Sequence, residues 1–152
     1  MSPDDTLGSA KSEFDRNLYH LGRYANRLRA LKLERHDAFA EPDDAAIEAI
    51  DLFVLRFLKS VDASTRRLFP AILRDQEEYD EGMALIDVLN RMEKLGWIAE
   101  AERWRTARER RNQLTHEYPD APRIRVAILE AALELERSIQ SDSRKILKRL
   151  SA

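Results

Sequence analysis

The sequence contains no cysteine, only four glycines and five prolines, and few aromatic residues, which make up 7% of the chain. Without cysteine there is no disulfide bond, no thiolate nucleophile and no cysteine-ligated zinc or iron–sulfur site. No window approaches the roughly 18 consecutive apolar residues of a membrane span, and residues 1–5 include two aspartates where a secretory signal would be basic. We therefore expect a cytoplasmic protein that does not enter a membrane and whose mature form is the whole chain.

The chain also lacks a large excess of charge of either sign. It carries 26 basic and 28 acidic residues, a formal net charge of −2, and its isoelectric point is near 6.0. This balance excludes a protein that binds DNA through a large net positive charge. A length of 152 residues fits a single domain spanning residues 1–152, and 43% hydrophobic residues suffice for a folded core.

Apolar residues recur at steps of three and four, which predicts helices. The expected ranges are about 9–36, from near Pro42 to before Pro70, 80–95, about 99–117, and from Asp120 or Pro122 to about 150. The inward positions are expected to include Phe14, Leu18, Leu21, Ala25, Leu28, Leu31, Ile47, Ile50, Phe53, Val54, Phe57, Leu58, Val61, Met83, Ile86, Leu89, Met92, Leu95, Trp104, Ala107, Leu114, Ile124, Ala127, Ile128, Ala131, Leu135, Ile139, Ile146 and Leu150. No alternating strand pattern occurs. The sequence therefore predicts an all-α, four- to five-helix, up-and-down bundle.

Two helix ends have particular signals. Asp80 is a plausible N-cap and Gly96 a plausible C-terminal glycine for the helix at 80–95. The last helix is diluted by polar residues at 138–143, including Asp142 and Ser143, so we expect its tail to fray or to need a partner.

The most informative stretch is 103–118, in which five arginines occur within nine residues and are followed by a histidine and a tyrosine. Such local enrichment favours an anionic partner. On a helix, Arg108, Arg111, Thr115 and Tyr118 line one face, and Asn112 and His116 share the adjoining face. Arg111 and His116 lie about 140° apart around an ideal helix, so they converge only if the helix end loosens or another chain completes the site.

A purely structural interpretation of the same stretch is also open. The arginines would pair with the glutamates of neighbouring helices, Trp104 would be a core residue, and His116 would cap a helix C-terminus.

The ordered string Arg111-Asn112-Gln113-Leu114-Thr115-His116-Glu117-Tyr118 resembles the Arg-x4-His-x-Tyr signature of HepT-like toxins in the HEPN superfamily. Residues 89–98 together with Trp104, and residues 49–57, are similar to segments of the HepT and nucleotidyltransferase-substrate-binding branch. The resemblance covers roughly residues 45–119.

This resemblance implies a HEPN-like helical bundle that forms a homodimer and acts as a metal-independent endoribonuclease without a cofactor. Arg111 would bind phosphate, His116 would be the general acid or base, and Asn112 would position one of them. Arg105, Arg108 and Thr115 would contribute to binding RNA or nucleotide. Attack by a ribose 2′-hydroxyl would leave a 2′,3′-cyclic phosphate, so DNA should survive.

The resemblance also implies that Tyr118 receives AMP from a cognate MntA-like nucleotidyltransferase antitoxin, which would neutralise the toxin. A tyrosine before Pro119 could instead simply pack the turn. Two other functions remain open: a non-catalytic substrate-binding subunit of a minimal nucleotidyltransferase pair, and a structural helical adaptor.

No metal site is expected. His20 and His36 have no ligand-like spacing to each other or to His116, and the sequence has no Gly-rich phosphate loop.

Overall fold

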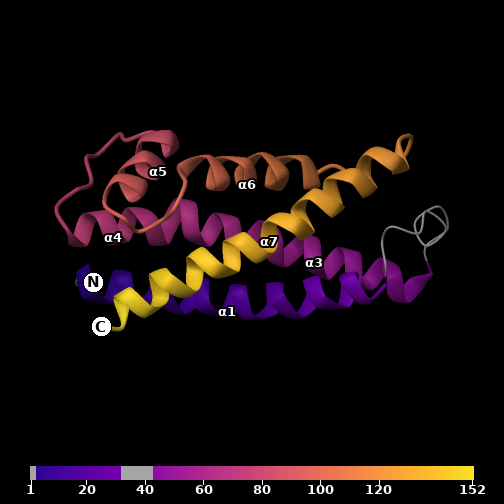
Figure 1. Ribbon diagram of the computed structural model, residues 1–152, viewed down its shortest axis with the longest axis horizontal. Helices are drawn as coiled ribbons and strands as arrows, with labels where there is room; N and C mark the ends of the chain where they lie inside the picture. Colours follow the sequence, from indigo (N-terminus) through magenta and orange to yellow (C-terminus); the bar gives the residue numbers. More distant parts are fainter. Residues whose placement is uncertain (1–2, 32–42) are drawn as a thin grey trace.

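The computed structural model describes residues 3–31 and 43–152, and this part of the chain is helical, without strands (Figure 1). The elements are α1 (Pro3–Ala30), α3 (Asp44–Asp62), the π-helical segment η1 (Ala63–Leu68), α4 (Phe69–Asp75), α5 (Leu85–Lys94), α6 (Ala101–Leu114) and α7 (Pro122–Leu150). Because α3, η1 and α4 are continuous, the described residues form five helices. The prediction of an all-α bundle of four or five helices is confirmed.

The long helices run back and forth along the bundle, with α7 oblique to the others, and the short helix α5 is tilted away from the long axis (Figure 1). α1 packs along the continuous α3–η1–α4 helix, α6 lies against α3, and α7 returns across both α1 and α6, so that the two ends of the chain lie at the same end of the bundle (Figure 1). Among the described helices, none is both long enough and apolar enough to cross a bilayer.

The core follows the predicted stripes of α1 and α3 closely. Most of the predicted inward residues of these helices, including Phe14, Phe53 and Phe57, are buried, whereas Leu31 and Ile47 are exposed. The predicted helix end at residue 36 and the predicted start near Pro42 lie outside the described residues. The first described residue after that gap, Asp43, is the N-cap of α3, and its carboxylate accepts a hydrogen bond from the Ala46 N–H.

The prediction that the second helix ends before Pro70 is wrong. In an α-helix the ring of Pro70 would press on the carbonyl four residues earlier. The chain avoids this by widening into η1, where the Phe69 N–H donates to the Ser64 carbonyl five residues back. The buried hydroxyls of Ser64 and Thr65 donate to the carbonyl of Val61, at 2.9 Å and 2.7 Å. The helix therefore continues through Pro70 to Asp75.

The helix predicted at 80–95 begins later than expected. α5 starts at Leu85, with Ala84 as its N-cap. The Asp87 carboxylate in the first turn accepts a hydrogen bond from the Ala84 N–H. Asp80 is therefore not the N-cap, and Ile86 faces outward. Gly96 does follow the helix, with a φ of +79° that favours glycine.

α7 remains helical through its polar residues. Asp142 and Ser143 are buried, Ile124 is half-exposed, and the helix runs to Leu150. Asp142 accepts hydrogen bonds from the Trp104 indole N–H, at 3.0 Å, and from Arg103, at 3.1 Å. The buried carboxylate of Asp142 thus has its partners on α6, whereas the buried Ser143 hydroxyl has no hydrogen-bond partner among the described residues.

We predict that Asp142→Ala lowers the free energy of unfolding by about 1–3 kcal/mol, because it leaves the buried Trp104 indole N–H without an acceptor. The measurement is urea denaturation followed by circular dichroism. Glu134→Ala, an exposed acid on the same helix, is the control, with a change of no more than about 0.5 kcal/mol. An equal loss in both variants would contradict the role assigned to Asp142.

Candidate functional site

The arginine-rich motif lies on α6, a helix with a very small apolar surface. Its buried residues are Ala101, Trp104, Ala107 and Leu114, and the remaining positions are polar or charged. The inward predictions for Trp104, Ala107 and Leu114 are confirmed. Trp104 is fully buried and meets Phe69 of α4 edge-on, with ring centroids 4.9 Å apart.

Asp62, at the end of α3, holds two arginines of the motif. Its Oδ1 accepts from Arg108 Nη1 at 3.1 Å and from Arg111 Nε at 3.0 Å, and its Oδ2 accepts from Arg111 Nη2 at 2.8 Å. The contact with Arg111 is therefore bidentate, the geometry in which a guanidinium fork matches a carboxylate. The three side chains, which we call the Asp62 clamp, are 19–32% exposed.

The clamp affects its two arginines in opposite ways. The hydrogen bonds that Arg111 donates to Asp62 raise the pKa of Arg111 above its ordinary value, against a smaller effect of burial. The pKa of Arg108 is lowered, first by burial and then by the positive charge of Arg66, which outweigh the attraction of Asp62. Both side chains remain charged at neutral pH.

His116 and Tyr118 lie in the turn that follows α6. His116 is exposed, and its ring meets that of Tyr118 edge-on, with centroids 6.0 Å apart. Tyr118 is partly buried against the core and has a φ of +52°, a conformation that L-residues seldom adopt. The expectation that Tyr118 packs the turn is consistent with this contact.

The described structure brings the predicted site residues together in two groups rather than one. Arg108 and Arg111 meet at Asp62, and His116 meets Tyr118, with no hydrogen bond or ion pair joining the side chains of the two groups among the described residues. Asn112 is exposed and touches Arg111 Nη1 only at 3.5 Å.

Two other predicted residues have local partners. Arg105 forms an ion pair with Glu102, and the Thr115 hydroxyl donates to the Asn112 carbonyl at 2.6 Å. Neither contacts the clamp in the part of the chain that the structure describes.

Every arginine of the 103–111 cluster has an acidic partner. Arg103 pairs with Asp142, Arg105 with Glu102, Arg108 and Arg111 with Asp62, and Arg110 with Glu109 at a longer 3.9 Å. The structural interpretation predicted glutamates of neighbouring helices as partners. The partners from neighbouring helices are instead aspartates, Asp62 and Asp142, and the glutamate partners belong to α6 itself.

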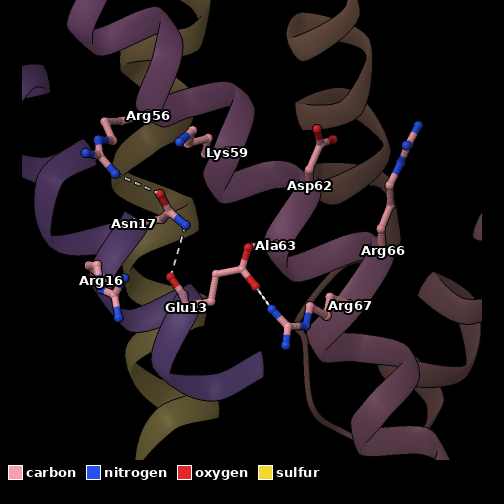
Figure 2. Close-up of a pocket in the computed structure, with 9 residues that line it drawn as sticks. All are labelled: Glu13, Arg16, Asn17, Arg56, Lys59, Asp62, Ala63, Arg66 and Arg67. Carbon is pink, nitrogen blue, oxygen red and sulfur yellow. Dashed lines mark hydrogen bonds and ion pairs between the residues drawn. The ribbon is translucent and has the colours of Figure 1, made fainter. Parts of the chain in front are cut away.

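Sequence reasoning did not single out Asp62. It follows the apolar stripe of α3 as an ordinary acid, and only the packing of α6 against α3 places it opposite Arg108 and Arg111. Asp62 also lines a hollow between α1 and α3, whose other side chains come from residues far from the motif in sequence (Figure 2).

Within residues 3–31 and 43–152, no group of three or more histidine, aspartate or glutamate side chains is arranged to hold a metal ion.

Comparison of the chain with protein-family models, with curated proteins and with solved structures found no match to any of them.

We predict that Asp62→Asn lowers the free energy of unfolding by about 1–2 kcal/mol. The clamp is partly exposed, so its contribution to stability should exceed that of an exposed ion pair. It should be smaller than that of a fully buried hydrogen bond to a charged group. Urea denaturation measures the change. Asp51→Asn, at an exposed acid on the same helix, should have almost no effect. Identical stabilities for the two variants would show that the clamp does not hold α6 on α3.

A second prediction concerns His20, whose Nδ1 is buried without a partner among the described residues. Burial, followed by the charges of Arg56, Arg23 and Arg16, lowers the pKa of His20 below its ordinary value. Folding therefore favours the neutral form of His20. The stability that depends on this neutral form is fully present above the unfolded-state pKa, near 6.5. It is lost as the pH falls through the folded-state pKa. We expect NMR titration to give His20 a lower pKa in the folded than in the urea-unfolded protein. A higher folded-state value would contradict the assignment.

Proposed function

We propose that the protein is a HepT-like, metal-independent endoribonuclease. The observation that carries the proposal is the geometry of the end of α6. There Asp62 fixes the guanidinium of Arg111 from the side of its Nε and Nη2 atoms, and the exposed His116 follows directly in the next turn.

The residue types fit the chemistry of RNA cleavage by internal attack. Asp62 takes Nε and Nη2 of Arg111, so Nη1 has only the long contact with Asn112 and can donate to a phosphate oxygen. The imidazole of His116 would take a proton from the 2′-hydroxyl or give one to the leaving 5′-oxygen. The 2′-oxygen forms a bond to phosphorus as the bond to the 5′-oxygen breaks, which leaves a 2′,3′-cyclic phosphate. This reaction needs no metal ion.

The proposed active form is a homodimer. Among the described residues Arg111 is hydrogen-bonded to Asp62 and His116 meets Tyr118, so one copy would supply Arg111 and the second copy His116 to each site. In a two-fold dimer the same arrangement occurs twice. The dimer would thus bring together two groups that a single chain keeps apart.

Tyr118 is the proposed site of control by a cognate nucleotidyltransferase. Its ring lies edge-on to His116, so AMP attached to the phenol oxygen would place a negative charge and a bulky group beside that imidazole. RNA phosphate would then be repelled and excluded from the same space.

A second candidate is a non-catalytic binding subunit of a nucleotidyltransferase pair. Its specific support is that Asp62 already occupies two nitrogens of Arg111 and that the other arginines of the 103–111 cluster also have carboxylate partners. Arginines ordered in this way could hold a nucleotide without any turnover, which is what a binding subunit requires.

The test is cleavage of mixed tRNA and mRNA in EDTA by purified protein whose intact mass shows no added AMP. We expect cutting by the wild type and a loss of at least about 10²-fold in both Arg111→Ala and His116→Ala, because each removes a group that acts in the transition state. Arg123→Ala, an exposed arginine on α7, should retain full activity.

Absence of cutting by folded, dimeric, unmodified wild-type protein would overturn the ribonuclease and favour the binding subunit. Full activity in either Arg111→Ala or His116→Ala would remove that residue from the proposed mechanism. A monomer at working concentration would contradict the composite site.

A further inference from the structure

The hollow between α1, α3 and η1 is a second concentration of positive charge, and it involves none of the five α6 arginines. Its volume is about 400 Å³, within the range of about 300–1,000 Å³ that is usual for small-ligand pockets. Five cationic side chains and two carboxylates line it. Figure 2 shows Arg16, Asn17 and Arg56 on one side of the view, with Asp62 and Arg66 on the other.

Both carboxylates of the hollow are already neutralised. Glu13 is ion-paired with Arg67, and Asp62 belongs to the clamp with Arg108 and Arg111. Four cations therefore remain without a carboxylate partner among the described residues: Arg16, Arg56, Lys59 and Arg66. The hollow thus has a local positive charge although the whole chain is slightly acidic.

Arg56 is held in place by a neutral partner. Its Nη1 donates to the Asn17 amide oxygen at 3.1 Å, and the Asn17 amide nitrogen donates to the Glu13 carbonyl at 3.0 Å (Figure 2). Asn17 is only 6% exposed, so this chain of hydrogen bonds lies at the inner wall. Because an amide carries no charge, Asn17 orients the guanidinium without neutralising it. The Arg56 Nε is buried and has no partner among the described residues.

The uncompensated charge acts on neighbouring groups. Arg66 contributes to the lowered pKa of Arg108, and Arg56 and Arg16 contribute, after burial, to the lowered pKa of His20. An anion in the hollow would relieve this repulsion. A phosphate group suits it better than a carboxylate, since it presents more acceptor oxygens to several guanidinium and ammonium donors at once.

We propose that this hollow is a binding site for a phosphate group, supplied either by a free nucleotide or by an RNA strand. The proposal does not rest on ribonuclease activity, because it depends only on residues of α1, α3 and η1. If RNA is the source, the strand would pass the Asp62 clamp, which borders both the hollow and the motif.

The test compares two triple variants that remove the same charge. Arg16→Gln, Lys59→Gln and Arg66→Gln together remove three exposed cations of the hollow. Arg123→Gln, Lys145→Gln and Lys148→Gln together remove three exposed cations of α7 that do not line it. The probes are ADP, by calorimetry, and a fluorescent 2′-O-methyl single-stranded RNA, by anisotropy. The methylated strand cannot be cleaved by 2′-hydroxyl attack, so binding is measured whether or not the protein is a nuclease.

We expect the hollow variant to weaken binding of at least one probe about tenfold or more, since hydrogen bonds between charged groups are involved, and the α7 variant to weaken it much less. Weakening of ADP alone identifies a nucleotide site, and weakening of RNA alone identifies a strand site. For RNA, the salt dependence should also become shallower in the hollow variant.

Equal weakening by the two triple variants would overturn the proposal, because it would show that only overall charge matters. Unchanged binding in the hollow variant would also overturn it. So would competition by poly-glutamate as effective as that of unlabelled RNA, since the hollow would then accept acidic protein segments as readily as phosphate.

Discussion

The position of α6 depends on two carboxylates that other helices supply. α6 buries only four of its residues, so apolar packing alone gives it a weak hold on the bundle. Asp142 of α7 accepts from Trp104 and Arg103 near the start of α6, and Asp62 of α3 accepts from Arg108 and Arg111 near its end. Charged hydrogen bonds at both ends thus fix the direction and rotation of a helix that is otherwise polar.

The same anchoring determines what the motif can do. A guanidinium bound on two nitrogens by Asp62 is ordered before any ligand arrives, which removes part of the entropic cost of holding a phosphate. It is also partly neutralised, so Arg111 alone makes a weak anion site. The uncompensated cations lie on the far side of Asp62, in the hollow between α1 and α3. Asp62 therefore separates an ordered, partly neutralised arginine pair from an open, positively charged surface.

The sequence was sufficient to predict the helical class, the stripes of α1 and α3, the glycine after α5 and the inward position of Trp104, because each depends on local periodicity or a single backbone requirement. It was insufficient for Pro70. Proline is normally excluded from helix interiors, but here the helix widens before it, and the Ser64 and Thr65 hydroxyls donate to the Val61 carbonyl. Asp62 and Asp142 were missed for a different reason. The role of an acidic residue on a helix depends on which arginine packs opposite it, and that pairing is set by the tertiary structure rather than by the local sequence.

The most direct measurement mixes Arg111→Ala protein with His116→Ala protein, each inactive alone, and assays RNA cleavage after the subunits exchange. If each site takes Arg111 from one copy and His116 from the other, half of the dimers contain one intact site, and activity should return to about a quarter of the wild-type value. No recovery, although exchange is confirmed by mass spectrometry, would contradict a site shared between two copies.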